Sequence, residues 1–245
     1  MKTVEGKIRK ADEIYRMIDD GDRIAVGVSG GKDSVALLCG LASYGSYAKK
    51  RFSLTALVLD PGFFNKPGDY SKVEELCEKL NLPMRLRRSD IGRVVFGTRG
   101  EKNPCSLCAR MRRGALHNMA IESGCNKIAF GHHMDDAVET FFLNMFYEGR
   151  IAAFQPVTYL SRKNITLIRP LILCTESEVR SAVKRGNLPI VKSRCPVDGQ
   201  SKRQEMKEFI GQKESEYPGF LKKTFAAMQK GDISGLSPKN NKESL

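Results

Sequence analysis

The stretch VGVSGGKDS, residues 26–34, constrains the fold of this chain more than any other segment. It follows an apolar, β-branched run at 23–28 that predicts a buried strand, and it leads into a helical pattern from about Lys32 to Ser43. Two adjacent glycines let backbone N–H groups converge on one point, which the positive end of the helix also faces. The stretch therefore predicts a phosphate-binding turn between a strand and a helix.

The side chains of this turn fit an anionic ligand. Ser29 and Ser34 supply hydroxyls and Lys32 supplies a cation, but the spacing is not that of a GxxxxGK[ST] loop. The alternative is a tight strand-to-helix turn that binds nothing. The candidate nucleotide-binding residues are Ser29, Gly30, Gly31, Lys32, Asp33 and Ser34.

Strand and helix patterns alternate along the rest of the chain. Apolar runs at 52–60 and after residue 126 predict further strands, and 84–90 predicts an edge strand, whereas 89–104 lacks a periodic pattern and is expected to be a loop. We therefore expect an α/β fold with a doubly wound parallel sheet covered on both faces, and with helices at both ends of the chain. The expected parts are an N-terminal helix at 1–20, a main domain at 21–199, C-terminal helices at 200–231 and a disordered tail at 232–245.

The charge balance points to a polyanionic partner. Lys and Arg number 41 against 28 Asp and Glu, a formal net charge of +13. Such an excess is typical of proteins that bind nucleic acid, although a merely basic protein is the plain alternative. No apolar run is long enough to span a membrane, and the charged first twenty residues lack the apolar core of a signal peptide, so we expect a cytoplasmic protein without membrane contact.

The chain has seven cysteines, two of which form a CxxC at Cys105 and Cys108. A CxxC can be a redox pair, half of a zinc site or part of an iron–sulfur site. No second CxxC is present, so a complete four-thiolate zinc site is not evident, and Cys195 is a lone cysteine further along the chain. The remaining cysteines are expected to be buried as small hydrophobic residues: 39, 77, 125 and 174.

A second polar motif, GHHMDD at 131–136, follows another predicted strand. Gly131 permits close backbone approach, and Asp135 and Asp136 open the next helix. Carboxylates beside a triphosphate are natural Mg²⁺ ligands, but Asp135 can equally be a helix cap. His132 and His133 either contact the nucleotide or pack.

SGGKDS resembles the PP-loop of the N-type ATP pyrophosphatase superfamily, and GHHMDD looks like the GHxxDD signature of its tRNA-modifying members. The resemblance implies that ATP binds at the carboxyl ends of the strands and is cleaved between its α and β phosphates, so that AMP is attached to a substrate oxygen. It also implies that the backbone at Leu59 meets adenine, that residues 21–199 form the ATP pyrophosphatase domain, and that Asp135 is the functional aspartate of the signature.

A narrower resemblance covers about residues 20–212. CSLCARMRRG, GHHMDDAVETFFLNMFY, IRPLI and RCPVDGQSKRQ, in that order, closely resemble the TtcA-like tRNA 2-thiocytidine synthetases. This implies that Cys105, Cys108 and Cys195 hold a [4Fe–4S] cluster with one open iron position. It further implies that the enzyme adenylates the C2 oxygen of an anticodon-loop cytidine and replaces it with sulfur delivered through the cluster. The implied partners are tRNA and a sulfur donor, either a cysteine desulfurase persulfide or inorganic sulfide; a homodimer is left open.

In this scheme Lys32 and Mg²⁺ offset charge on the departing pyrophosphate, and Asp135 holds Mg²⁺ or positions the nucleotide. The expected catalytic set is Cys105, Cys108, Cys195, Asp135 and Lys32, and the expected RNA contacts are Arg110, Arg112, Arg113, Lys202 and Arg203. The alternatives are a PP-loop tRNA-modifying ligase that uses an amine, a thiolase acting on another base, a cluster-bearing sulfur carrier that uses no ATP, and a zinc-bearing RNA-binding protein without activity.

Overall fold

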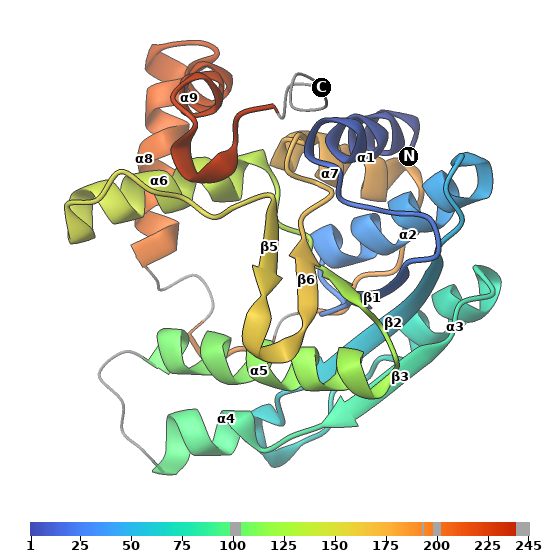
Figure 1. Ribbon diagram of the computed structural model, residues 1–245. Coiled ribbons are helices and arrows are strands. Elements are labelled where there is room, and N and C mark those ends of the chain that lie inside the picture. Colours follow the sequence, from blue (N-terminus) through green and yellow to red (C-terminus); the bar gives the residue numbers. More distant parts are fainter. Residues whose placement is uncertain (99–103, 193, 198–201, 239–245) are drawn as a thin grey trace.

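The computed structural model describes residues 1–98, 104–192, 194–197 and 202–238 and is built around one twisted sheet (Figure 1). The six strands lie in the order β3-β2-β1-β4-β6-β5. Their bounds are Arg23–Gly27 (β1), Ser53–Asp60 (β2), Met84–Arg88 (β3), Lys127–Ala129 (β4), Val157–Leu160 (β5) and Ile165–Ile168 (β6). This arrangement, with helices on both faces, confirms the predicted α/β doubly wound fold.

Five of the strands form the expected parallel sheet, and β5 is an unpredicted addition to its edge. The pairs β1–β2, β1–β4, β2–β3 and β4–β6 are parallel, whereas β5 pairs antiparallel with β6. A turn of 3-10 helix, Ser161–Lys163, joins β5 to β6, and Asn164 closes it in the left-handed conformation with φ of 47°. The short β5 is largely half-buried and lacks the apolar run of a central strand, so the sequence pattern did not reveal it.

The strands bury both of their faces, because alternate residues enter two separate apolar clusters. Ile24 and Val26 of β1 belong to the cluster under helices α1, α2, α3 and α7, while Ala25 belongs to the cluster under α4 and α5. The helices of the first face are Lys2–Tyr15 (α1), Lys32–Tyr47 (α2), Ser71–Lys79 (α3) and Glu176–Arg185 (α7). On the other face lie Ile91–Arg93 (α4) and Pro104–Glu122 (α5).

The segment predicted as a loop at 89–104 contains regular turns in the part that the structure describes. Helix α4 continues into a π-helical turn, Val94–Thr98. Ile91 and Val95 are buried beside Phe63, which lies in a short 3-10 turn, Phe63–Asn65. Four-residue spacing of two apolar residues is too short a pattern to identify a helix from sequence, which is why the prediction missed it.

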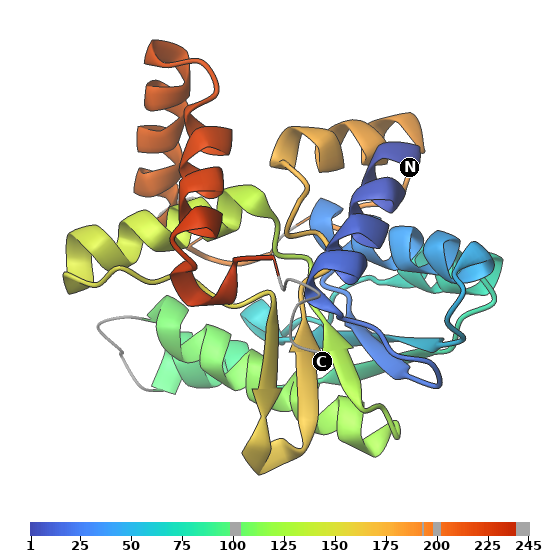
Figure 2. The same ribbon diagram turned by 45° about the horizontal axis from the view of Figure 1, so that its top comes forward.

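The C-terminal helices form a hairpin on α6 and project from the sheet (Figures 1 and 2). The helices are Met134–Glu148 (α6), Lys202–Glu216 (α8) and Phe220–Lys230 (α9), separated near Pro218 as predicted. Phe142 of α6 packs its ring against Phe209 at 5.4 Å and stacks on Phe220 at 5.9 Å between centroids. This aromatic cluster attaches the hairpin to the main domain.

The first part of the tail is ordered, which corrects the prediction of disorder from residue 232. A 3-10 turn, Ile233–Gly235, leads to Leu236, which is fully buried. The hydroxyl of Tyr15 in α1 donates to the Leu236 carbonyl at 2.9 Å. Residues 239–245 lie outside the described residues, and the predicted domain boundaries stay predictions. Among the described residues, no helix combines the length and apolar character needed to cross a membrane.

The order in which strands are added to the sheet reverses at β1. β2 lies on one side of β1 and β4 on the other, and the connections that lead to them, through α2 and α5, cover opposite faces of the sheet. In open α/β sheets such a switch point leaves a crevice at the carboxyl ends of the strands, where ligands bind.

Candidate functional site

The turn after β1 has the geometry of an anion-binding loop. Gly31 caps α2, and Gly30 adopts φ of +82°, a conformation that favours glycine. The Gly31 amide donates to Ser29 Oγ at 3.3 Å, the Ser29 amide donates to Ser34 Oγ at 3.2 Å, and Ser34 Oγ donates to the Gly31 carbonyl at 2.9 Å. The two serine hydroxyls thus shape the loop at the start of the helix.

The end of β4 lies directly against this loop. A Cβ atom at Gly131 would stand 3.0 Å from the carbonyl carbon and oxygen of Asp33 and 3.2 Å from the Ser34 amide nitrogen. Backbone atoms have little room to move at such distances, so only glycine fits. The predicted close approach at Gly131 is therefore present, and it joins the two motifs.

A cavity of about 580 Å³ opens at the carboxyl ends of β2, β1, β4 and β6. This volume falls in the range of small-molecule sites, about 300–1,000 Å³. Of the residues predicted to bind nucleotide or RNA, it brings together Ser29, Asp33, Ser34, Leu59, Gly131, Arg112, Arg113 and Arg203, together with His132. Helix α5 supplies one wall, which includes Ala109 and Leu116.

Lys32 lies beside the loop within a charged cluster. Its Nζ lies 2.9 Å from Asp33 and 3.0 Å from Glu176. Burial works against the charge of Lys32, but these two carboxylates outweigh it and raise its pKa. Burial likewise opposes the charge of Glu176, yet Lys207 and Lys32 lower the pKa of its carboxyl to about 2. The lysine is therefore held charged at the mouth of the loop.

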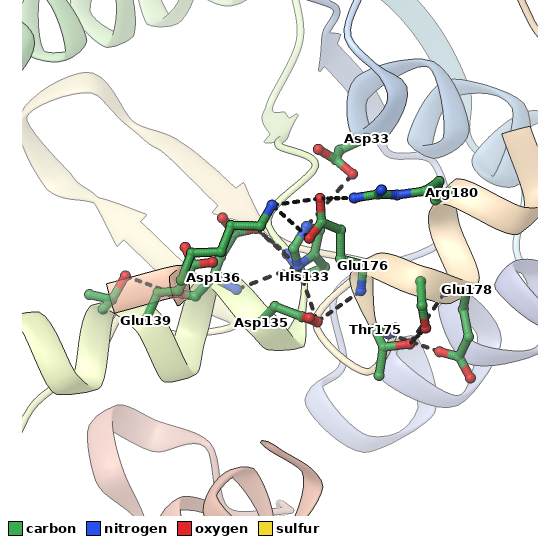
Figure 3. A network of polar contacts seen from close by, with 12 residues as sticks. Asp33, His133, Asp135, Asp136, Glu139, Thr175, Glu176, Glu178 and Arg180 are labelled. Atoms are coloured by element: carbon green, nitrogen blue, oxygen red, sulfur yellow. Dashed lines mark hydrogen bonds and ion pairs between the residues drawn. The ribbon is translucent and has the colours of Figure 1, made fainter. Parts of the chain in front are cut away.

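Asp135 lies in the first turn of α6 and contacts the start of α7. Its Oδ2 accepts from the Glu176 amide at 2.8 Å, so it caps the N-terminus of α7 (Figure 3). Burial raises the pKa of the Asp135 carboxyl. Asp135 is not among the lining residues of either cavity identified in the described part of the chain. Its role as a Mg²⁺ ligand stays a prediction.

The other residues of the second motif organise the start of α6. His133 caps the helix, since its ring accepts from the Asp136 amide while its own amide donates to Asp136 Oδ2 at 2.8 Å. Asp136 in turn pairs with Arg203 of α8 at 3.3 Å. Glu139, one turn further on, lies 3.7 Å from the same guanidinium, and burial raises the pKa of its carboxyl to about 7. His133 thus packs and caps, whereas His132 faces the cavity.

The candidate cluster ligands come together from two segments. Cys105 and Cys108 lie in the first turns of α5, Cys105 exposed and Cys108 buried. Cys195 packs on the same apolar cluster as Cys108. Burial raises the pKa of the Cys108 thiol, and the nearby Cys195 and Cys105 raise it further. The positive charge of Arg112 has the opposite effect and lowers this pKa. As predicted, the four other cysteines are buried: 39, 77, 125 and 174.

The described residues hold no group of three His, Cys, Asp or Glu side chains close enough to bind one metal ion. A cubane makes a different demand, because its cysteines bind separate iron atoms and need only surround a common space. Three thiols around one space, next to a cationic guanidinium that favours thiolate, fit such a cluster as a donor set.

A smaller cavity of about 200 Å³ connects Cys195 with the phosphate loop. Its lining includes Ser29, Gly31, Asp60, Arg112 and Cys195, and Ser29 and Arg112 also line the larger cavity. The segment before Cys195 is tied to the loop, since the Val191 amide donates to the Gly30 carbonyl at 2.9 Å. The cysteine side of the site and the nucleotide side are therefore neighbours.

The predicted RNA contacts separate into two groups. Arg112, Arg113 and Arg203 line the larger cavity, and the buried Nε of Arg112 has no hydrogen-bond partner in the chain. Arg110 and Lys202 are exposed, and Lys202 lies 4.9 Å above the Tyr147 ring. The first group can reach a bound ligand, while the second lies on the outer surface.

Phe154 and Arg169 are among the residues of the larger cavity that sequence reasoning missed. Arg169 follows β6 within the apolar stretch NITLIRPLI and is 9% exposed. The available signal was a single charged residue inside an apolar run, because burying a charge without a partner is energetically unfavourable. Phe154 carries no such signal, since an aromatic residue before a strand is ordinary.

Comparison with known proteins shows the family to which the chain belongs. A family model described as the PP-loop domain matches residues 3–214. Two curated relatives are tRNA-cytidine(32) 2-sulfurtransferases. That of Syntrophotalea carbinolica is 39% identical, with 85% of this chain and 81% of the relative covered. That of Nitrosomonas europaea is 40% identical, with 91% and 71% covered.

Among solved structures, the U34-tRNA thiolase NcsA from Methanococcus maripaludis, with its [4Fe–4S] cluster, matches with a TM-score of 0.76. The match covers 94% of this chain and 78% of that chain at 24% identity. At this identity it shows the shared fold, and it agrees with the strand order and helical layers described above.

Proposed function

Because the chain belongs to the PP-loop family, and within it to the tRNA-cytidine(32) 2-sulfurtransferases, we propose that it is an ATP-dependent tRNA thiolase that forms 2-thiocytidine in an anticodon loop. One observation carries the proposal: Arg112 and Ser29 line both the larger cavity and the cavity that contains Cys195. Activation by ATP and delivery of sulfur can therefore occur at one place. The substrates are tRNA, ATP and a sulfur donor.

The chain's own residues account for ATP binding. The loop from Ser29 to Ser34 offers inward amides and hydroxyls to the phosphates, at the positive end of α2. Leu59, in the adjacent strand β2, lines the same cavity, which supports binding of the adenosine on the β2 side. Lys32, held charged by Asp33 and Glu176, stands ready to offset charge on the leaving pyrophosphate.

Thiolation needs activation because the C2 oxygen of cytidine is a poor leaving group. Attack of that oxygen on the α-phosphate releases pyrophosphate and converts the oxygen into a phosphate ester. A sulfur nucleophile then adds to C2, and AMP leaves with the former oxygen. Arg112 and Arg113 line the place where this phosphate would lie and can stabilise its charge throughout. Mg²⁺ is the divalent ion that we expect beside the phosphates, held by Asp135 or by Asp33, whose buried Oδ1 has no hydrogen-bond partner among the described residues.

Cys105, Cys108 and Cys195 would hold a [4Fe–4S] cluster by three thiolates, next to the smaller cavity. When bound, the cluster supplies an iron position that no cysteine occupies, through which sulfur is delivered. Cys108 is buried and Cys195 is half-buried against the apolar cluster on which Leu107 and Met111 also pack, which limits the access of water to these two thiols. The donor, whether a persulfide or sulfide, the homodimer and the cytoplasmic location stay predictions.

The substrate must present a base from a loop, since unpaired bases can be turned into a protein pocket. The exposed Arg110 and Lys202 flank the cavity residues Arg112 and Arg203 in sequence, and they suit contacts with the phosphates around that base. Their contribution accounts for part of the net charge of +13.

The test compares Cys195→Ala with Cys77→Ala in the anaerobically reconstituted full-length chain. Both substitutions remove one thiol, but Cys77 is buried between α3 and the sheet, away from the cavities. We expect Cys195→Ala to lose iron and 2-thiocytidine formation while it still binds ATP, and Cys77→Ala to keep all three. Iron content, equilibrium binding of ATP and mass spectrometry of digested tRNA provide the readouts.

Two outcomes would contradict the proposal. The first is a wild-type protein that consumes ATP with tRNA but forms no thiolated nucleoside, which would favour a ligase. The second is full iron content in Cys195→Ala, which would remove Cys195 from the ligand set.

A further inference from the structure

Several buried polar atoms of the larger cavity have no hydrogen-bond partner among the described residues, and two of them belong to side chains that the mechanism above does not use. They are Nε of Arg169 and Nδ1 of His132, and both residues line the cavity. An unsatisfied buried donor or acceptor costs about 1–3 kcal/mol, so such atoms are rare unless a ligand completes them. Neither residue has a role in the mechanism described above.

Both side chains are fixed in place by the same aromatic ring. The guanidinium of Arg169 lies 4.7 Å above the centroid of Phe154, and its Nη1 donates to the carbonyl of Gln155 and, at 3.5 Å, to Thr158. The His132 ring lies 5.2 Å from the Phe154 ring. The two unpaired atoms are therefore held near one another rather than free to find partners elsewhere.

The sheet order assigns these residues to the acceptor side of the site. Leu59 lies on β2, the phosphate loop follows β1, His132 follows β4 and Arg169 follows β6, and these strands are neighbours in that order. With adenosine on β2 and phosphates at β1, the space beyond β4 is left for the group that attacks the α-phosphate. Adjacent strands are about 4.8 Å apart, so Arg169 lies roughly 10 Å from the loop across the sheet, room for one pyrimidine ring.

The walls of this part suit a base. Phe130, Leu116, Leu167 and Phe154 line the cavity there, and apolar and aromatic walls hold a base that has left its stack. Burial lowers the pKa of His132 to about 4, so its ring is neutral at physiological pH and has one nitrogen available as an acceptor. Arg169 offers only donors.

We propose that Arg169 and His132 read the target cytosine, with Arg169 Nε–H donating to N3 and His132 Nδ1 accepting from the exocyclic N4 amine. This inference rests on the proposed function and names the part of the site that selects its base. The C2 oxygen next to N3 then faces the phosphate loop. The arrangement satisfies both unpaired atoms and leaves C2 open to the sulfur nucleophile.

Arg169 is the residue that discriminates against uracil. Uracil carries a hydrogen on N3 and an oxygen on C4, so both of its groups are reversed relative to cytosine. A neutral histidine can change its tautomer and donate to the C4 oxygen, but an arginine cannot accept a hydrogen bond. Uracil would therefore leave two donors facing each other in a buried site. A donor at N3 also draws electron density from the ring, which makes C2 more electrophilic.

The test pairs a change in the enzyme with a change in the base. The holoenzyme and its Arg169→Met variant act on anticodon stem-loops that carry either cytidine or 3-deazacytidine at the target position, where 3-deazacytidine replaces N3 by a C–H group. Single-turnover formation of the thiolated nucleoside and stem-loop affinity are measured. Iron content and ATP affinity serve as controls for intact cluster and nucleotide sites.

We expect the wild type to bind the 3-deazacytidine stem-loop about 10- to 100-fold more weakly, as is typical for a hydrogen bond from a charged donor. Affinity is the deciding readout, because the loss of N3 also slows attack at C2 independently of any contact with the enzyme. In Arg169→Met most of that penalty should disappear, because the donor is already gone. The same comparison with His132→Ala and a stem-loop that lacks the N4 amine tests the second contact. A structural role alone would lower every affinity equally and produce no such coupling.

Equal penalties in wild type and Arg169→Met would overturn the proposal for Arg169. If Arg169→Met does not fold, the wild type alone decides: affinities within twofold for cytidine and 3-deazacytidine would overturn it. Failure of the proposed function looks different, since the wild type would then form no thiolated nucleoside on the unmodified stem-loop either.

Discussion

Replacing Gly30 by alanine should disturb the nucleotide loop and the cysteine segment together, and Gly21→Ala provides a matched control. Gly21 and Gly30 have almost the same backbone conformation, with φ of +84° and +82°. A Cβ at Gly21 would meet nothing within 4 Å, whereas one at Gly30 would lie 2.6 Å from Cβ of Val191. The pair therefore separates backbone strain from the contact between the two segments.

The expected destabilisation has two parts, the backbone strain of alanine and the overlap of its Cβ with Val191. Alanine in the left-handed region costs about 1–2 kcal/mol at either position. At Gly30 the overlap with Val191 adds about 1–3 kcal/mol, the usual cost of overpacking. The overlap is relieved only if the loop and the segment separate, which breaks the bond from the Val191 amide to the Gly30 carbonyl. Since 1.4 kcal/mol is tenfold, we expect ATP affinity to fall about tenfold or more in Gly30→Ala.

Isothermal titration with a non-hydrolysable ATP analogue measures the loop, and iron content after anaerobic reconstitution measures the cysteine side. Gly21→Ala should lower only the thermal stability and keep both readouts. Gly30→Ala should reduce both, and Val191→Gly added to Gly30→Ala should restore part of the iron content. The reasoning is refuted if Gly30→Ala binds the analogue within twofold of Gly21→Ala and retains its iron.

Three further predictions concern stability and RNA binding. Burial raises the pKa of Glu139 to about 7 from an ordinary 4.5, so the folded state keeps a proton that the unfolded state loses. The stability that this proton contributes is complete below about pH 4.5 and is lost as the pH rises through 7. Glu139→Gln should therefore raise the free energy of unfolding at pH 8 by about 2 kcal/mol in denaturant titrations. An unchanged dependence of the unfolding free energy on pH would contradict this. Thr175→Ala removes the capping box of α7 and should lower the free energy of unfolding by about 1 kcal/mol in the same assay. Ser177→Ala, two residues further along the same helix, should lower it by less. Arg110→Ala should weaken tRNA binding modestly and reduce its salt dependence without changing ATP affinity, which filter binding at several salt concentrations can show.

The sequence predicted the parts of the molecule that depend on local patterns. The strand, turn and helix around SGGKDS and the close approach at Gly131 could be predicted because each needs specific residues at fixed spacing. The aromatic and charged residues that complete the cavity were not, because Phe154 and Arg169 reach it only through the β5–β6 hairpin. That hairpin depends on pairing at the sheet edge, which no local pattern records.

The contact made by Asp135 likewise depends on the tertiary fold and not on a local pattern. Its position at the start of a helix beside a phosphate loop allowed either a Mg²⁺ ligand or a helix cap, and its Oδ2 accepts from the amide of Glu176, which begins a helix 41 residues later. Only the tertiary fold brings the starts of these two helices together, so no local pattern identified this partner. Asp33 Oδ1, by contrast, is buried without a hydrogen-bond partner and lies in the cavity.

The most direct test of the account is a single assay of the anaerobically reconstituted full-length protein with tRNA, a sulfide source and ATP. The account predicts about four iron atoms and four sulfides per chain, and 2-thiocytidine in the tRNA only when ATP is present. Zinc in place of iron, or ATP-independent sulfur in the tRNA, would contradict it.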